Sequence, residues 1–248
     1  MLKLQQGHLL CYLKIMAAFK EMRPTYAQVL PPAVRILLIL NIAVFAIQKL
    51  FDHHDYLEEH FALWPIIIHS YQHGYEAFFE HLHFMPWQLL TYGFLHANFN
   101  HIFFNAFGLW MFGKVLEEFL GTKRFTIYFL TCIIGAAVLQ LIYSTWASYH
   151  GMLPAPTIGA SGGLFGLLLA FGVFFPRSHI YLFFLPIGIE ARYFVIIYGL
   201  LELFSSFNTS SHIAHLAHVG GMLTGGLIIA YWAGKLPIKP KRILYWNH

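Results

Sequence analysis

The sequence is poor in charge. Only 10% of its 248 residues are Asp, Glu, Lys or Arg, whereas about a quarter of the residues in a soluble domain are charged. Because 58% of the residues are apolar, the chain lacks the charged side chains needed to cover a water-exposed surface. The composition therefore excludes a water-soluble domain and indicates an integral membrane protein.

Cysteine is also scarce. Cys11 and Cys132 are the two cysteines and lie far apart, so neither a disulfide framework nor a thiolate metal site is expected. The net charge of +4 does not indicate nucleic-acid binding, because the basic residues lie in short loops between apolar runs, where they set membrane topology. No cleavable signal peptide is expected, because the first 33 residues lack an apolar core followed by a small-residue cleavage site.

Long apolar runs are present instead. Six are expected to cross the membrane as helices: residues 34–50, 87–113, 125–146, 161–175, 193–207 and 213–233. A spanning helix needs about 20 residues, so the fourth run is short. Residues 180–189 are interrupted by Pro186 and Gly188, and we expect an interfacial loop there rather than a seventh span. The predicted fold is an all-α membrane protein, a six-helix transmembrane bundle with a short, buried fourth helix.

The distribution of charge orients this bundle. With both termini in the cytoplasm, all 15 Lys and Arg residues except Lys49 fall on the cytoplasmic side, as the positive-inside rule requires. The outer loop, residues 51–86, is acidic and aromatic instead. We predict a cytoplasmic segment at 1–30, either an interfacial helix or a loosely ordered tail, a membrane domain at 31–233, and a cytoplasmic tail at 234–248.

Ser161 is a candidate nucleophile at the start of the short fourth run. It lies in Gly159-Ala160-Ser161-Gly162, where small neighbours leave the hydroxyl approachable. The N-terminus of a helix offers free N–H groups and partial positive charge, which can stabilise an oxyanion. Since the helix is short, Ser161 should lie below the outer membrane surface. The same residue would also suit a plain helix cap, and the four-residue pattern leaves both interpretations open.

His218 is the candidate base for Ser161. Small residues let two membrane helices approach closely, which would bring the imidazole within hydrogen-bonding reach of the hydroxyl, as an activated nucleophile requires. Gly221 and Gly225 share a helix face with His218, and the fourth run has a matching face of small residues in Gly162 and Gly166. The alternative is a structural histidine that is satisfied by a neighbouring hydroxyl.

Two further polar residues are spaced to share one helix face, His101 and Asn105 at i and i+4. An imidazole N–H and an amide N–H are suitable donors to a developing oxyanion. No acidic residue within the predicted spans is obviously placed to orient His218, so we expect a serine–histidine dyad rather than a triad.

Taken together, these motifs resemble the rhomboid intramembrane serine proteases over about residues 31–233. The matching segments are HANFNHIFFN at 96–105, residues 117–121, GASGGLFG at 159–166 and AHVGG at 217–221. The resemblance implies that Ser161 is the nucleophile and His218 the general base, and that His101, Asn105 and the Ser161 backbone N–H stabilise the oxyanion.

The resemblance also implies supporting roles and a setting. Glu117 would tie down the loop after the second span, Phe165 would pack on His218, and His96 would be structural. The chain looks like the basic six-helix bacterial form, which implies an inner-membrane enzyme in contact with lipid that cleaves transmembrane segments of other proteins. No cofactor, metal, nucleotide or nucleic acid is implied.

One departure concerns the outer loop. Many family members carry a Trp-Arg pair there, whereas the tryptophans Trp64 and Trp87 are followed here by Pro65 and Gln88. This difference leaves the conformation and lipid contacts of the loop open.

Other functions compete with the protease. A catalytically inactive relative could bind membrane proteins without cutting them, although both candidate residues are present. A histidine-ligated membrane metal enzyme is suggested by His212, His215 and His218 and by His96 with His101, but such sites need many converging imidazoles, and neither paired histidine boxes nor an H-E-x-x-H motif occur. A transporter is disfavoured because the spans show no symmetric pair of broken helices.

Overall fold

The computed structural model describes residues 30–52, 55–66, 82–153, 155–181, 187–206, 214–240, 243–244 and 246. The longer helices in this part of the chain are α2 (Pro32–Leu50), α6 (Phe99–Leu120), α7 (Thr122–Tyr149), α8 (Ser161–Phe174), α9 (Ala191–Ser205) and α10 (His215–Trp232). The shorter elements are α3 (Tyr56–Phe61), α5 (Gln88–Thr91), the 3-10 helix η1 (Tyr92–Phe94), and the strands β1 (His179–Tyr181) and β2 (Gly188–Glu190).

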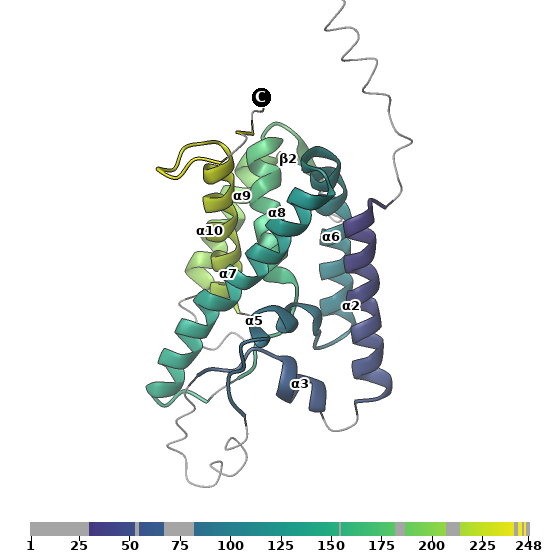
Figure 1. Ribbon diagram of the computed structural model, residues 1–248, viewed down its shortest axis with the longest axis vertical. Helices are drawn as coiled ribbons and strands as arrows, with labels where there is room; N and C mark the ends of the chain where they lie inside the picture. Colours follow the sequence, from purple (N-terminus) through teal and green to yellow (C-terminus); the bar gives the residue numbers. More distant parts are fainter. Residues whose placement is uncertain are drawn as a thin grey trace, which may run out of the picture.

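The short helix α8 lies at the centre of the bundle (Figure 1). It packs against α6, α7, α9 and α10, while α2 packs against α6 on one side of the molecule. The small elements α3 and α5 lie together at one end of the bundle. Because α8 begins at Ser161, the candidate nucleophile lies where several helices meet.

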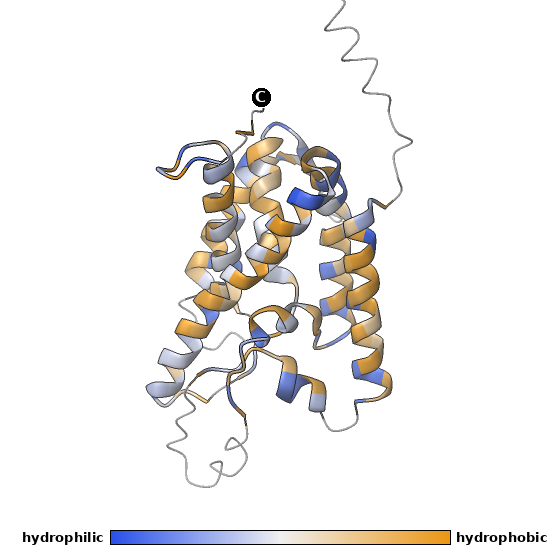
Figure 2. Cartoon of the chain, viewed as in Figure 1, coloured by the Kyte–Doolittle hydropathy of each residue, from blue (hydrophilic) through white to orange (hydrophobic). Residues whose placement is uncertain are grey.

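The helices are apolar on their outer faces as well as inside. By length and composition, α2 and α7 could each cross a membrane, and α8 is an apolar helix of 14 residues. Figure 2 shows hydrophobic residues along most of the length of α2. Exposed apolar side chains also occupy α9, where Phe204 is 68% exposed. Such a surface suits lipid rather than water.

Five of the six predicted helices have bounds close to those expected, but the second was predicted incorrectly. In place of one helix over residues 87–113, α5 and η1 are followed by an extended segment, and α6 begins only at Phe99. The reason is a cap: the side chain of Asn98 accepts a hydrogen bond from the backbone N–H of His101 at 2.9 Å. The helix then continues to Leu120 and ends at Gly121, whose φ is 78°.

Two other segments differ from a simple loop or tail. The ends of the apolar stretch 180–189 pair as antiparallel strands, with Ile180 opposite Ile189; residues 182–186 lie outside the described part. Near the C-terminus, Leu244 N–H donates to Trp232 O at 2.8 Å, so this part of the predicted tail folds back onto the bundle. The N-terminal segment 1–29 lies outside the described residues.

Direct backbone contact joins α8 and α10. A Cβ atom added to Gly221 would lie 1.9 Å from the carbonyl oxygen of Gly162, so no side chain fits between the two helices there. Glycine at position 221 therefore permits the approach that brings Ser161 near His218, whereas a Cβ atom on Gly162 would meet Ala136 of α7.

The other two glycines singled out in the sequence meet α7, which lies against both helices. A Cβ atom on Gly166 would lie 2.5 Å from the sulfur of Cys132, and one on Gly225 would lie 2.3 Å from the hydroxyl of Tyr128. That hydroxyl donates to the Gly166 carbonyl oxygen at 2.7 Å. The three helices α7, α8 and α10 thus form a close-packed unit.

Candidate active site

The hydroxyl of Ser161 lies against the imidazole of His218. The distance from Ser161 Oγ to His218 Nε2 is 2.8 Å. Ser161 is the first residue of α8, and His218 lies in the first turn of α10. A serine hydroxyl hydrogen-bonded to a largely buried imidazole is the arrangement that activates a serine for nucleophilic attack.

An aromatic side chain fixes the plane of this imidazole. Phe165, one turn after Ser161 on α8, stacks on His218 with ring centroids 4.1 Å apart and an interplanar angle of 11°. The same ring stacks on Tyr198 of α9 at 5.3 Å. Phe165 therefore lies between α9 and α10 and restricts rotation of the His218 ring.

His101 and Asn105 lie beside the loop that leads into Ser161. A Cβ atom on Gly159 would be 2.6 Å from His101 Nε2 and 3.8 Å from Asn105 Nδ2. Gly159 also has a φ of 119°, a conformation that other residues rarely adopt. Glycine is thus required here for two reasons: its backbone angle would strain any other residue, and a side chain would collide with the imidazole of His101.

The hydrogen bonds of these two residues leave donors available. His101 Nδ1 accepts from the backbone N–H of Ala97 at 3.4 Å, which assigns the proton of a neutral ring to Nε2, on the Gly159 side. Asn105 Nδ2 donates one of its two hydrogens to the His101 carbonyl oxygen at 3.0 Å. One N–H of each side chain can therefore be directed toward an oxyanion.

The loop before Ser161 is held by backbone hydrogen bonds. Gly159 N–H donates to the Tyr92 carbonyl oxygen at 2.8 Å, and Leu63 and Thr157 exchange two hydrogen bonds of 3.0 Å. The segment around Leu63 is therefore tied to the loop that leads into the candidate nucleophile.

His96 and Glu117 occupy structural positions. His96 is fully buried in the segment before α6 and meets His101 edge to face, with ring centroids 5.1 Å apart. Glu117 lies inside α6 rather than after it, and its carboxylate accepts from Ala33 N–H at 2.9 Å and Val34 N–H at 2.8 Å. It also accepts from the hydroxyl of Thr122 at 2.8 Å. Glu117 thus caps the N-terminus of α2 as well as holding the start of α7.

The expectation that no acidic residue within the predicted spans is placed beside His218 to orient it is wrong. Glu202 Oε2 on α9 lies 2.8 Å from His218 Nδ1 and 2.6 Å from His215 Nδ1. A signal was present in the sequence, because Glu202 is the one acidic residue in the predicted span 193–207, and acidic residues within membrane spans usually have a function. Its partner could not be identified without the packing of α9 on α10.

The same three residues form a set with metal-ligand spacing. The ligand atoms of Glu202, His215 and His218 lie within 4.8 Å of one another. The two hydrogen bonds to Glu202 already use the Nδ1 atoms, so a metal ion would have to displace both protons. His212, the other histidine considered for a metal site, lies outside the described residues.

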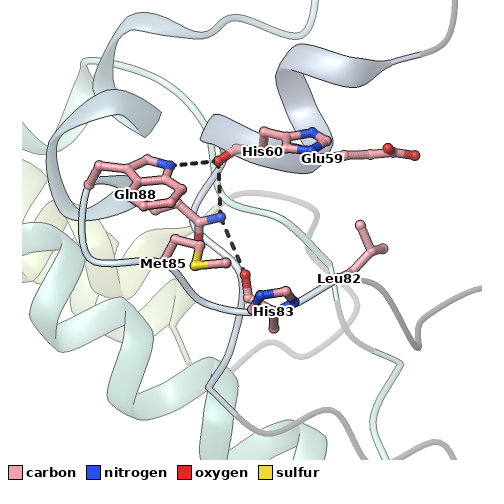
Figure 3. Close-up of a pocket in the computed structure, with 7 residues that line it drawn as sticks. Glu59, His60, Leu82, His83, Met85 and Gln88 are labelled. Atoms are coloured by element: carbon pink, nitrogen blue, oxygen red, sulfur yellow. Dashed lines mark hydrogen bonds between the residues drawn. The ribbon is translucent and has the colours of Figure 1, made fainter.

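A pocket formed by residues of the segment 59–88 is separate from these residues (Figure 3). It is lined by Glu59, His60, Leu82, His83, Met85, Trp87 and Gln88. The amide nitrogen of Gln88 donates to the carbonyl oxygens of His60 at 3.2 Å and His83 at 3.4 Å, while its oxygen accepts from Trp64 N–H at 3.2 Å. At the position where the sequence departs from the family pattern, buried Gln88 thus joins the backbone at His60, Trp64 and His83.

Comparison with known proteins places this geometry in a family. The family model for the rhomboid domain matches residues 83–235, a range that includes Ser161, His218 and Glu202. The chain is 30% identical over 139 residues to the rhomboid protease GluP of Bacillus subtilis, an alignment that covers 56% of this chain and 24% of that protein. It is 26% identical over 208 residues to the rhomboid protease GlpG of Photorhabdus laumondii, covering 84% of this chain and 64% of that one.

A eukaryotic relative matches as well. Rhomboid protein 1, mitochondrial, of Saccharomyces cerevisiae is 28% identical over 151 residues, covering 61% of this chain and 39% of that protein. The chain thus spans less than two thirds of the length of each of these relatives.

Proposed function

The chain belongs to the rhomboid family, and we propose that it is a serine endopeptidase that cleaves transmembrane segments of other membrane proteins. The observation that carries the proposal is the 2.8 Å contact between Ser161 Oγ and His218 Nε2. A helix cap would not require an imidazole at this position, whereas a nucleophile requires a base there.

The reaction follows from this contact. Ser161 Oγ attacks the scissile carbonyl carbon as its proton passes to His218 Nε2, and His218 then protonates the leaving amine. Water hydrolyses the acyl-enzyme by the same route in reverse. The negative charge on the substrate oxygen would be stabilised by the Ser161 backbone N–H and by the donors of His101 and Asn105. No metal, nucleotide or other cofactor takes part.

The proposed setting is a membrane crossed six times, by α2 and by α6 to α10. The membrane domain comprises residues 31–233, the segments 1–30 and 234–248 are cytoplasmic, and residues 51–86 lie outside, in the orientation that the charges favour. A helix of 14 residues is about 21 Å long at 1.5 Å per residue, shorter than a hydrocarbon core of about 30 Å. Ser161 would then lie below the outer surface, and the bacterial inner membrane is the proposed compartment.

Substrates would reach the site from the lipid. The helices α6 and α9 present exposed apolar side chains, including Phe104 and Phe204 at 68% each, and we place substrate access between them. A substrate helix must unwind locally before its carbonyl can be attacked. Small or helix-breaking residues near the cleavage site would ease that unwinding, and this defines the preferred substrate class.

Two alternatives are weaker. An inactive membrane-protein binder would not need both Ser161 and His218 in hydrogen-bonding contact. A metal enzyme would have to use Glu202, His215 and His218, and the Nδ1 hydrogen bonds already account for the positions of these residues.

The decisive experiment compares wild type with Ser161→Ala and His218→Ala, using purified protein and a helical reporter substrate in lipid vesicles. We expect either substitution to lower cleavage by at least about 1,000-fold, as loss of a nucleophile or its base does in serine proteases. Ser144→Ala is the matched control, because Ser144 donates only to its own helix, at Leu141 O, and should leave cleavage unchanged.

Two further measurements separate the alternatives. A fluorophosphonate should label wild type at Ser161 but not the His218→Ala variant, whereas an inactive binder would not be labelled. Cleavage should also persist in the presence of a metal chelator. Cleavage that survives Ser161→Ala would overturn the serine mechanism, and cleavage lost on chelation would favour the metal enzyme.

A further inference from the structure

The carboxylate of Glu202 is held by two imidazoles of α10. Its Oε2 atom lies 2.6 Å from His215 Nδ1 and 2.8 Å from His218 Nδ1, and the residue is 7% exposed. His215 and His218 are three residues apart and share a face of α10, with ring planes perpendicular at a centroid distance of 6.2 Å. One carboxylate oxygen therefore accepts from the base of the proposed reaction and from its neighbour.

These contacts determine which nitrogen of His218 carries the proton. An ionised carboxylate can only accept hydrogen bonds, so Nδ1 of His218 must be the protonated nitrogen facing Glu202. In the neutral ring, Nε2 then has a free lone pair, and Nε2 is the atom 2.8 Å from Ser161 Oγ. This is the tautomer that a general base for Ser161 requires.

Glu202 also contributes to the packing of α9. Among the described residues of α9, the buried ones are Ala191, Val195 and Glu202, so Glu202 is the buried contact of the C-terminal half of that helix. A carboxylate in this setting is costly unless it is paired. A hydrogen bond to one imidazole would nevertheless be enough to join α9 to α10. Joining the two helices would not require a bond to Nδ1 of His218, the residue that contacts Ser161.

We propose that Glu202 is a positioning residue for the reaction, so that the Ser161–His218 pair works as a Ser-His-Glu arrangement with His215 holding the carboxylate. The inference rests on the proposed peptidase function. When Ser161 attacks, its proton moves to His218 Nε2, while the Nδ1 proton stays on His218 and Glu202 stays ionised. The carboxylate stabilises the imidazolium until Nε2 returns its proton to the leaving amine.

The test uses the whole 248-residue chain in vesicles, with the variants Glu202→Gln and Glu202→Asp and the control Glu190→Gln. Glutamine keeps the shape of the side chain and one acceptor oxygen, but it removes the charge. We expect kcat to fall on the order of 100-fold, with KM within about twofold of wild type. The rate of fluorophosphonate reaction at Ser161 should fall in parallel, and Glu202→Asp should recover part of the kcat.

Glu190 is a suitable control because it precedes the same helix and forms an ion pair with Arg192 at 2.8 Å, away from the site and partly exposed. Its substitution should leave kcat and KM unchanged. His215→Leu should lower kcat by less than Glu202→Gln, about tenfold or below, because it removes only the residue that holds the carboxylate.

The outcomes separate the possible failures. A Glu202→Gln variant with wild-type kcat overturns the role of Glu202 and leaves the protease standing. If Glu202→Asp does not recover the lost kcat and both variants have a lower thermal unfolding midpoint than wild type, the role of Glu202 is structural. That result also overturns its proposed role in the reaction. A wild-type protein that neither cleaves nor reacts with the fluorophosphonate overturns the proposed function and this inference with it.

Discussion

Two neighbours of the central helix α8, α10 and α9, are held in opposite ways. The helix α10 meets α8 through backbone, since no side chain fits between Gly221 and Gly162. The helix α9 buries only Ala191, Val195 and Glu202 among its described residues and exposes large apolar side chains such as Leu201 and Phe204. One contact leaves no room for adjustment, and the other depends on a few side chains.

This difference separates the parts of the proposed mechanism. The nucleophile and base lie on the close-packed pair α8 and α10, so their 2.8 Å contact is set by backbone positions. The carboxylate lies on the loosely held helix, and its position depends on hydrogen bonds to two side chains. Substitutions at the α8–α10 contact should therefore abolish folding and activity together. Substitutions on α9 should change the rate of cleavage with little change in the fold.

The largest effect is expected at the α8–α10 contact. Gly221→Ala places a methyl group on the Gly162 carbonyl, and backbone cannot move aside as a side chain can. We expect destabilisation of at least about 3 kcal/mol, above the usual range for overpacking, with loss of cleavage. Thermal unfolding in detergent and the reporter assay measure both.

Gly226→Ala is the matched control on the same helix. The nearest atom to its new methyl group is Leu169 Cδ2 at 3.4 Å, which is an ordinary contact. The unfolding midpoint should stay the same or rise slightly, because alanine lowers the conformational entropy of the unfolded chain relative to glycine. Equal midpoints for the Gly221 and Gly226 variants would contradict the idea of a rigid contact.

A smaller effect is expected at the far side of the bundle. Glu117→Ala removes the acceptor for two N–H groups at the start of α2, which should lower stability by about 1–3 kcal/mol. Since Glu117 does not touch the candidate site, kcat of the folded fraction should be unchanged. Glu118→Ala, at the exposed neighbouring position, should change neither quantity, and a fall in kcat without destabilisation would place Glu117 in the reaction instead.

The smallest effect is expected at Phe165, which links the two regions by stacking on both Tyr198 and His218. Phe165→Leu keeps an apolar side chain but loses ring stacking worth about 0.5–1.5 kcal/mol, so kcat should fall about two- to tenfold. Phe171→Leu is the control, because that ring packs on Phe112 instead. A larger loss in the control would show that the aromatic core, not the stacking on His218, matters.

Much of the helical layout could be predicted because apolar runs and helix length are local properties. The fourth run was expected at residues 161–175, and α8 spans Ser161–Phe174. The prediction for the second run was wrong because the side chain of Asn98 caps a helix that begins only at Phe99, within a stretch for which hydropathy predicts a single helix. The family resemblance, based on four short motifs, is confirmed by the match over residues 83–235.

The candidate site could be predicted only in part. Ser161 and His218 were recognisable because a pair of glycines that share a helix face lies close to each of them, a pattern that the sequence displays directly. The oxyanion donors His101 and Asn105 were recognisable from their i, i+4 spacing. Their roles in the reaction remain predictions that the substitutions above test.

By itself, the sequence determined that this is a membrane protein of mostly helical fold and which serine and histidine are candidates for chemistry. These conclusions depend on composition and on residues a few positions apart. The tertiary structure alone decided that Glu202 contacts His218, 16 residues away, and that Glu117 caps α2, 84 residues before it. A carboxylate between apolar helices must find a donor, but which donor it finds depends on how the helices pack.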